Sequence, residues 1–503
     1  MRFSARQYQI DAARFHLAHP QSILLADPGT GKTSISLMVI DELKRRGELT
    51  SPILILSTLR IVQIVWPEEI RKWDQFSHIS FSIIHGPKKS QRVNDRVDIH
   101  LVNNEGLAWL AKEGHLSKYR VLFVDESPKY KNPKATRTKI LMGAVSQFTR
   151  RHCLTGTPAP KSYVDLFSQV YVADAGVSLG SKFHIFRRSY FYNLDEMLRR
   201  WVDLVHRSTP GSRRLTQWEI EDLADGYFPG MLDARKKKFL NAYYQSRFFA
   251  KVTNMRYQSD WRPRAGAKEE IERRIAHLCF RLNGEKLLTL PRLIENEIRV
   301  DIPSRYARMS TDALNEFIKS PEGTYSRYVT ARQMSGGVSE VVGVVHDAKI
   351  NALEELIDSL QGNPLFVLFF FRAEGEYLSQ RLDAPLLYGG LTATRVASVC
   401  GAWNSGSIPI LLAQYGSISH GLNLQSSGCS HVAHFNLTDK PDDYDQAIKR
   451  IRRQGNSAGI VFNHHILARN CDTDYKVLAG IRESLRQQQE LLDALEGVSH
   501  ATD

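Results

Sequence analysis

Cysteine is scarce in this chain. The 503 residues include five, and none is spaced as Cys-x-x-Cys: Cys153, Cys279, Cys400, Cys429 and Cys471. An odd number of widely scattered cysteines argues against a disulfide-stapled scaffold and against a zinc knuckle. The distribution instead favours a reducing compartment.

Long apolar runs are missing as well. The most apolar stretch, residues 364–371, is far too short to cross a bilayer, which takes about 20 apolar residues. Residues 1–15 contain no apolar stretch of signal-peptide length, and we see no internal repeat or low-complexity tract. We therefore expect no membrane partner and a cytoplasmic location.

Acidic residues are outnumbered, with 67 Lys and Arg against 54 Asp and Glu, a formal net charge of +13. Such a balance favours a polyanionic partner, nucleic acid by default, although an ordinary basic protein has the same signature. Residues 183–300 hold 23 basic and 15 acidic side chains, so well over half of the excess lies there. Around its densest cluster, at 235–238, aromatic residues are interleaved: Tyr243, Tyr244, Phe248, Phe249, Tyr257 and Trp261. This mixture is typical of a surface that follows a phosphate backbone, or of a solvated helix face with core aromatics.

Short apolar runs alternate with helix-periodic segments in the first and last thirds of the chain. Strands are expected at 23–26, 53–57, 99–103, 121–124 and 152–155, and again at 365–370, 385–387, 408–413 and 431–435. Helices are expected between them, for example at 34–46, 348–361, 374–381, 394–405 and 443–453. This alternation predicts an α/β fold with two helix-covered parallel sheets.

The predicted domains follow from this pattern. Residues 1–180 form the first lobe, 181–345 a mostly helical basic insertion, 346–470 the second lobe, and 471–503 a C-terminal helix. The apolar residues of that last helix recur on one face, which we expect to pack against one of the lobes.

A phosphate-binding loop lies between the expected strand 23–26 and the helix that follows it. Its sequence is DPGTGKT, made of Asp27, Pro28, Gly29, Thr30, Gly31, Lys32 and Thr33. The glycines let backbone N–H groups face the phosphates of a nucleotide, and the new helix directs its positive end at them. Lys32 is expected to reach the β and γ phosphates, and the Thr33 hydroxyl to bind Mg²⁺. Ala26 stands where the general pattern has its first glycine.

An acidic pair, Asp125 and Glu126, directly follows the apolar strand 121–124. Beside a phosphate-binding loop such a pair completes a nucleotide-hydrolysing site. We expect Asp125 to hold Mg²⁺ through water and Glu126 to activate the attacking water; the plainer alternative is a surface acidic pair.

Two arginines, Arg450 and Arg453, lie three residues apart on an expected helix and project from one face. Guanidinium groups in fixed positions can stabilise charge that develops on a transferring phosphoryl group. If this helix faces the phosphate-binding loop across a cleft, hydrolysis requires the cleft to close. An exposed basic helix is the alternative.

Together these segments resemble the motifs of superfamily two helicases, and more narrowly those of Swi/Snf-like ATPases of the short virus-encoded type. In the first lobe the similar segments are 6–9 (RQYQ), 25–33 (LADPGTGKT), 52–58 (PILILST), 66–73 (WPEEIRKW), 102–107 (VNNEGL), 124–132 (VDESPKYKN) and 154–158 (LTGTP). In the second lobe they are 365–371 (LFVLFFF), 417–424 (SISHGLNL) and 446–455 (QAIKRIRRQG), and Leu290-Pro291 resembles the entry to that lobe. Two positions depart from the family pattern: Pro128 replaces a common His, and His420 stands where small residues are common.

The resemblance implies two RecA-like lobes that bind ATP and Mg²⁺ between them and move along duplex or branched DNA. It implies Gln9 as the reader of adenine, and Thr58, Asn103, Thr155 and Asn423 as contacts to the nucleic-acid backbone. It also implies the cytoplasm of a host cell if the chain is viral, and we expect a monomer. An RNA helicase, a strand-separating or branch-migrating enzyme, and a nucleic-acid clamp with little turnover remain alternatives.

Overall fold

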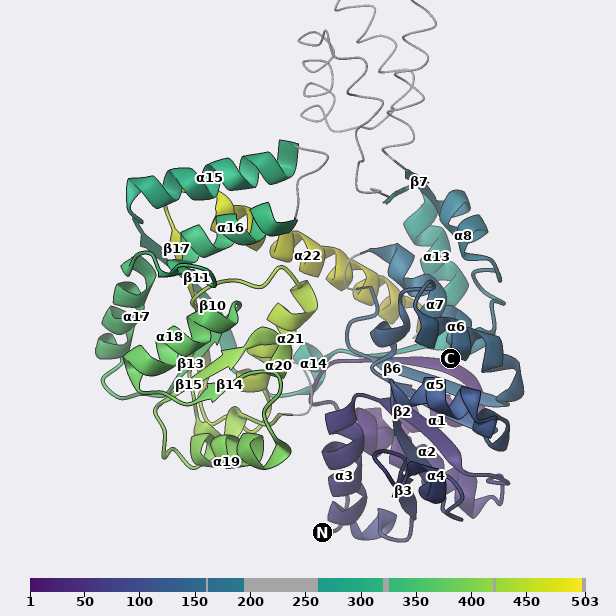
Figure 1. The fold of residues 1–503 in the computed structure, drawn as a ribbon. Coiled ribbons are helices and arrows are strands. Elements are labelled where there is room, and N and C mark those ends of the chain that lie inside the picture. Colours follow the sequence, from purple (N-terminus) through teal and green to yellow (C-terminus); the bar gives the residue numbers. More distant parts are fainter. Residues whose placement is uncertain (160–161, 194–260, 320–324, 419–421, 500–503) are drawn as a thin grey trace, which may run out of the picture.

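Two parallel β-sheets organise the structure, a computed structural model that describes residues 1–159, 162–193, 261–319, 325–418 and 422–499. Each sheet is the centre of one α/β lobe, and the two lobes lie side by side (Figure 1). This arrangement confirms the predicted fold class of two parallel-sheet lobes.

The first sheet has seven strands in the order β3-β4-β2-β5-β6-β1-β9, and every neighbouring pair is parallel. Its strands are β1 (Gln21–Ala26), β2 (Ile53–Ser57), β3 (Phe81–Ile83), β4 (Ile99–Asn103), β5 (Val121–Asp125), β6 (Arg150–Thr155) and β9 (Cys279–Leu282). The five predicted strands of this lobe are confirmed, and β3 and β9 are additional. Because β1, β6 and β5 are neighbours, the loops at their carboxyl ends meet at one edge of the sheet.

The second sheet has six strands in the order β10-β17-β16-β13-β15-β14, again parallel throughout. They are β10 (Arg292–Val300), β13 (Leu365–Phe369), β14 (Leu386–Leu387), β15 (Ile410–Gln414), β16 (His431–His434) and β17 (Ile460–Ala468). The four predicted strands are confirmed, but β10 and β17 were not foreseen. β17 escaped prediction because Asn463, His464 and His465 interrupt its apolar run, although all three are buried.

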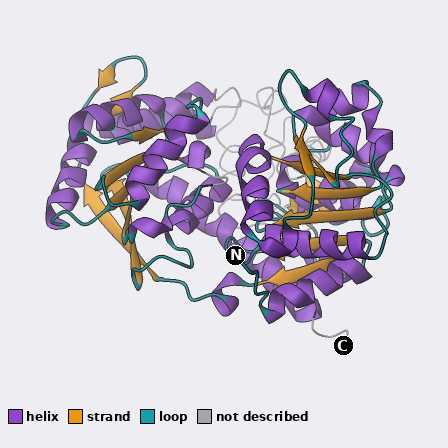
Figure 2. Cartoon of the chain, turned by 90° about the horizontal axis from the view of Figure 1, so that it is seen from below, coloured by secondary structure: helices purple, strands orange, loops and turns teal. Residues whose placement is uncertain are grey.

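Helices cover the faces of both sheets (Figure 2). The first lobe has α1 (Gln7–Ala18), α2 (Lys32–Arg45), α3 (Trp66–Lys72), α4 (Lys89–Arg92), α5 (Gly106–Lys112), α6 (Thr136–Ala144), α7 (Leu166–Asp174), α8 (Phe183–Tyr190) and α13 (Ala267–Ile275). The short α14 (Gly284–Leu287) lies between β9 and β10. The second lobe has α15 (Ser304–Lys319), α16 (Tyr325–Gly336), α17 (Ala348–Ser359), α18 (Arg372–Leu382), α19 (Ala393–Asn404), α20 (Tyr415–Ile418) and α21 (Pro441–Ile451). Two small antiparallel strand pairs complete the fold, β7 (Phe191–Asn193) with β8 (Trp261–Pro263), and β11 (Val338–Ser339) with β12 (Gly343–Val344).

The predicted insertion, residues 181–345, needs a correction at its C-terminal part. Strand β9 extends the first sheet beside β1, and strand β10 forms an edge of the second sheet beside β17. β9 was hidden because it is only four residues long and contains Arg281, whereas the run that forms β10 was noted after Leu290-Pro291 but was not assigned to the sheet, because three consecutive polar residues, 295–297, break its alternation. The basic cluster at 235–238 and the aromatics from Tyr243 to Tyr257 lie outside the described residues. Trp261 is described, and the Arg187 guanidinium lies 4.0 Å from the centre of its ring.

The C-terminal helix α22 (Thr473–Ser499) packs against both lobes, and not against one of them as predicted. Leu478 and Ile481, near its start, belong to a core cluster of the second lobe. Leu491, Leu492 and Leu495, near its end, are buried in the core of the first lobe. The helix therefore runs from one lobe to the other, as Figure 1 shows. Sequence periodicity identified its apolar face but not that two cores share it.

Among the described residues, no helix has both the length and the apolar character that a membrane span needs.

Candidate functional site

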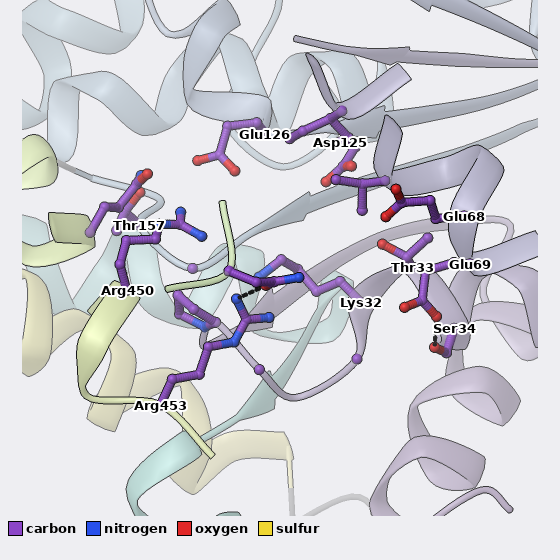
Figure 3. A pocket seen from close by; sticks show the side chains of 18 of the residues that line it. Lys32, Thr33, Ser34, Glu68, Glu69, Asp125, Glu126, Thr157, Arg450 and Arg453 are labelled. Atoms are coloured by element: carbon purple, nitrogen blue, oxygen red, sulfur yellow. Dashed lines mark hydrogen bonds between the residues drawn. The ribbon is translucent and has the colours of Figure 1, made fainter. Parts of the chain in front are cut away.

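A cleft of about 310 Å³ lies between the lobes, within the size range of small-molecule sites. Predicted site residues from the first lobe line it, namely Pro28, Gly29, Gly31, Lys32, Thr33, Asp125 and Glu126. From the second lobe it is lined by Asn423, Arg450 and Arg453. Figure 3 shows Asp125, Glu126, Lys32, Arg450 and Arg453 around this space. The structure thus brings together residues that are more than 400 positions apart in the chain.

The phosphate-binding loop connects β1 to α2, as its sequence predicted. Gly29 and Gly31 both adopt a left-handed backbone with φ of +91°. At Gly31 a Cβ would also lie 2.4 Å from Gln9 Nε2, so any side chain there would displace the Gln9 amide. Lys32 begins α2, and its ammonium donates a hydrogen bond to the Ala26 carbonyl at 2.8 Å. Burial lowers the pKa of Lys32, against the opposing effect of Glu126 and Asp125.

Gln9 contacts the phosphate-binding loop directly. Its side-chain amide donates to the Thr30 carbonyl at 3.1 Å, and its carbonyl accepts from the Arg6 backbone N–H at 3.0 Å. The Thr30 hydroxyl in turn donates to the Asp27 carbonyl at 2.8 Å. Gln9 and Thr30 therefore support the shape of the loop from behind, outside the lining of the cleft.

The Asp27 carboxylate faces away from the cleft toward strand β9. Its Oδ2 accepts from Arg281 Nη2 at 2.9 Å and from the Gly284 backbone N–H at 2.8 Å. Burial by itself would raise the pKa of Asp27, but Lys449 and Arg281 lower it below its usual value. Asp27 consequently acts as an anchor of the loop through its side chain.

Asp125 is buried at the end of β5. Trp66 Nε1 donates to its Oδ2 at 3.1 Å, and the Ser57 hydroxyl donates to the same oxygen at 3.4 Å. Burial, followed by the neighbouring Glu126, raises the pKa of Asp125 to about 6. A carboxylate in such surroundings gains most from a nearby cation, and both Thr33 and Lys32 line the same cleft.

Glu126 is held in an unusual backbone conformation, with φ of +70°. A left-handed backbone is costly for a non-glycine residue and persists where the surroundings enforce it, often at functional sites. Here the Glu126 N–H donates to the Leu154 carbonyl at 3.0 Å, which ties the residue to the end of β6. Its side chain is partly exposed and lines the cleft.

A chain of side chains links the segment after β5 to the loop after β6. The Ser127 hydroxyl donates to Gln169 Oε1 at 2.7 Å, and Gln169 Nε2 donates to the Pro158 carbonyl at 2.6 Å. The Thr155 hydroxyl is buried and accepts from the Thr157 N–H at 2.9 Å, while Thr157 lines the cleft. These contacts connect the acidic pair to the loop after β6, which contains the family-like segment 154–158.

The other expected nucleic-acid contacts do not gather in one place. Thr58 and Asn103 lie at or just beyond the carboxyl ends of the neighbouring strands β2 and β4, and the Asn103 amide donates to Glu105 Oε2 at 2.8 Å. Asn423 lies elsewhere, in the cleft, where its Oδ1 accepts from Arg453 Nη1 at 2.8 Å. The residues around His420 lie outside the described part of the chain.

The two arginines reach the cleft from α21 and the residues that follow it. Arg450 Nη1 donates to the Leu422 carbonyl at 3.2 Å, and burial lowers the pKa of Arg450 to about 10, with Arg453 adding to the effect. Arg453 lies close to the phosphate-binding loop, since a Cβ on Gly29 would be 3.8 Å from its side chain. The second lobe therefore delivers two positive charges beside the loop that would hold the phosphates.

Three residues of the site were missed as individual contributors. Trp66 was noted only as part of a family segment, but its fully buried indole N–H holds Asp125. Glu69 lines the cleft and accepts from Ser34 at 3.1 Å. Arg281 anchors Asp27 from 254 residues away. The rule that a buried indole N–H takes a partner could have flagged Trp66, whereas no local signal marks Arg281.

Comparisons with known proteins identify the family of the chain. The family model of the SNF2-related domain matches residues 8–217, and that of the helicase conserved C-terminal domain matches residues 348–455. The chain belongs to the Swi/Snf-like branch of the superfamily two helicases. As a member of this family it is a nucleic-acid-dependent ATPase.

Individual relatives are distant. "Putative protein p41" of Acyrthosiphon pisum secondary endosymbiont phage 1 is 26% identical over 97% of this chain and 98% of its own length. The human "DNA annealing helicase and endonuclease ZRANB3" is 23% identical over 93% of this chain, which spans only 38% of that protein. A solved structure, "Sulfolobus solfataricus SWI2/SNF2 ATPase core in complex with dsDNA", has 19% identity and a TM-score of 0.41, covering 93% of this chain and 88% of that one.

Proposed function

We propose that this Swi/Snf-like ATPase hydrolyses ATP in the cleft between its lobes and uses the resulting lobe movement to travel along duplex or branched DNA. The observation that carries the proposal is the shared cleft (Figure 3). Lys32, Asp125 and Glu126 line it from the first lobe, and Arg450 and Arg453 line it from the second.

The roles of the residues follow from their positions. Lys32 and the N-terminus of α2 would bind the phosphates, while Gln9 would read the adenine base next to the loop that it supports. Thr33 and Asp125 would hold Mg²⁺, which would supply positive charge to the phosphates when bound. Burial raises the pKa of Asp125, so a bound cation would stabilise its charged form, which fits that assignment.

Glu126 is the candidate general base. Its carboxylate lines the cleft beside Asp125 and would accept the proton of the attacking water. Arg450 and Arg453 would stabilise charge on the transferring phosphoryl group. Since they come from the other lobe, hydrolysis would require closure, and product release would permit opening.

Coupling to DNA would use backbone contacts on both lobes. Thr58, Asn103, Thr155 and Asn423 are the proposed residues. Of these, Asn423 accepts a hydrogen bond from Arg453, so it would link the bound nucleotide to the DNA backbone. Thr155 would act indirectly, through Thr157 and the loop after β6, because its own hydroxyl is buried and engaged. We propose that one chain acts as a monomer.

The deciding experiment measures ATP hydrolysis by the full chain with blunt duplex DNA, forked DNA, a four-way junction, single-stranded DNA or RNA. Strong stimulation by duplex or branched DNA is expected, and displacement of a third strand from a triplex would then measure translocation. Stimulation by RNA or single strands alone would favour a conventional helicase. A flat response to every nucleic acid would favour a clamp with little turnover.

A further inference from the structure

A second, smaller cavity of about 120 Å³ lies behind the phosphate-binding loop, also between the lobes. It adjoins the ATP cleft, because Pro28, Gly156 and Asp445 line both spaces. Asp27 contributes to its lining from the first lobe, and Lys449 contributes from the second. A carboxylate and an ammonium thus border one small space from opposite sides of the interlobe gap.

The Asp27 side of this space is fixed by the first lobe alone. Asp27 Oδ2 accepts from Arg281 Nη2 at 2.9 Å and from the Gly284 N–H at 2.8 Å. The Arg281 side chain is 1% exposed, and its second amino group donates to the Leu25 carbonyl at 3.2 Å. The carboxylate at the start of the phosphate-binding loop therefore keeps its place whatever the second lobe does.

The Lys449 side of the space belongs to the second lobe. Lys449 lies on α21, directly before Arg450, and its ammonium pairs with Asp445 Oδ2 at 2.8 Å. Burial would lower the pKa of Lys449, but Asp445 and Asp27 together raise it, so the group stays charged. Lys449 in turn helps to keep the pKa of Asp27 low. The two opposite charges attract each other across the gap.

Resting on the proposed ATP site, we propose that Lys449 is a positioning residue for ATP hydrolysis. Its ammonium draws α21 toward the Asp27 carboxylate at the foot of the phosphate-binding loop, and this brings Arg450, the next residue on the helix, into the cleft. Arg281 provides a fixed anchor for the carboxylate, and Lys449 provides the movable partner. Closure of the lobes is thereby coupled to the phosphate-binding loop through the attraction between Lys449 and Asp27.

This role predicts different effects on the Kd for nucleotide and on kcat. Lys449→Met should leave nucleotide binding by the first lobe intact, because Lys32, Arg281 and Gly284 are unchanged, so the Kd for a non-hydrolysable ATP analogue should change less than about twofold. Closure should become less favourable, and the DNA-stimulated kcat should fall roughly five- to twentyfold. Lys449→Arg keeps the charge and should restore most of the rate.

A matched control lies at the start of the same helix. Lys440 also pairs with an aspartate, Asp443 at 3.9 Å, but its side chain is 64% exposed, and it lines neither of the two interlobe spaces. Lys440→Met should therefore leave both kcat and Kd near the wild-type values. Thermal melts of every variant show whether a lost rate reflects lost folding.

Two double variants identify the partner through which Lys449 acts. If Asp27 is that partner, Lys449→Met should have little further effect on kcat in an Asp27→Asn background. Asp445→Asn should fail to rescue Lys449→Met. Full rescue by Asp445→Asn would mean that Lys449 only neutralises its helix neighbour, and this outcome would overturn the proposal.

Failure of this proposal can be distinguished from failure of the proposed function. If DNA stimulates the wild-type enzyme and Lys449→Met keeps the wild-type kcat, the positioning role is refuted and the proposed motor function stands. A kcat loss accompanied by an equal rise in Kd also refutes it, because the residue would then serve binding. Wild-type protein without stimulated hydrolysis overturns the proposed function and this role with it.

Discussion

Replacing Trp66 by Phe should uncouple Asp125 from its positioning contact while keeping an aromatic ring in the core. The Trp66 side chain is fully buried at the start of α3, and its N–H donates to Asp125 Oδ2 at 3.1 Å. The segment before it, Ile61–Val65, is a π-helix, a rare conformation that often occurs at functional sites. Phe cannot donate this bond, so the weak contact from Ser57 at 3.4 Å alone would orient that oxygen.

The size of the effect follows from the type of bond. A hydrogen bond to a charged group contributes about 1.5–3 kcal/mol, and each 1.4 kcal/mol corresponds to about a tenfold change in an equilibrium or rate constant. If about half of that energy serves the transition state, kcat for DNA-stimulated hydrolysis should fall roughly three- to twelvefold. The Mg²⁺ concentration for half-maximal rate should rise as well, because Asp125 is a proposed ligand.

Trp403→Phe is the matched control for this experiment. Trp403 is equally buried, and its indole N–H donates to the Leu424 carbonyl in the second lobe at 3.0 Å. This variant loses the same kind of donor and should melt at a lower temperature, yet it should keep the wild-type dependence on Mg²⁺. Unchanged kcat and unchanged Mg²⁺ dependence in Trp66→Phe would refute the reasoning. So would the same shift in Mg²⁺ dependence in both variants.

Two further predictions concern the base and the buried histidines. Glu126→Gln should lower kcat by roughly 10²–10⁴-fold while DNA binding, measured by fluorescence anisotropy, stays within about twofold; substantial residual turnover would argue against Glu126 as the base. Burial lowers the pKa of His465 to about 3 and that of His464 to about 4, from an ordinary value of 6.5. Below about pH 6.5 these histidines are protonated in the unfolded chain but stay neutral in the folded protein. The free energy of unfolding should therefore fall as the pH drops from about 6.5 toward 4. Denaturant titrations at stepped pH check this, and stability that is constant over that interval would contradict it.

Most of the residues that line the interlobe cleft were accessible to prediction because each belongs to a short contiguous motif, several of them at a strand end. The strand–loop–helix sequence around Lys32 and the apolar strand before Asp125 are local patterns, and parallel strands bring their carboxyl ends to one edge. The spacing of Arg450 and Arg453 is local too, but the expected helix ends earlier than predicted, because α21 stops at Ile451 and Arg453 lies beyond it. Roles inferred from resemblance were less informative, since Asn103 bonds a neighbouring glutamate and the Thr155 hydroxyl is buried.

The remaining features depend on contacts between distant parts of the chain. Arg281 lies in a four-residue strand with no marked periodicity, and its importance appears only when β9 pairs with β1. The two-lobe packing of α22 could not be foreseen either, because an apolar face does not specify which core will cover it. The same is true of Lys449, which in the sequence is one more cation in a basic helix.

The sequence by itself determined the fold class, the strands that carry the motifs, and the chemical types at the ATP site, because periodicity and motif spacing are encoded within short windows. Only the tertiary structure decided which residues of the two lobes face each other. In it Asp27 contacts Arg281, 254 residues away, and Trp66 donates a hydrogen bond to Asp125. Asp27 and Lys449 line the same small cavity. The physical reason is that strand order and lobe docking arise from the burial of whole faces, a property of the complete chain that no local segment contains.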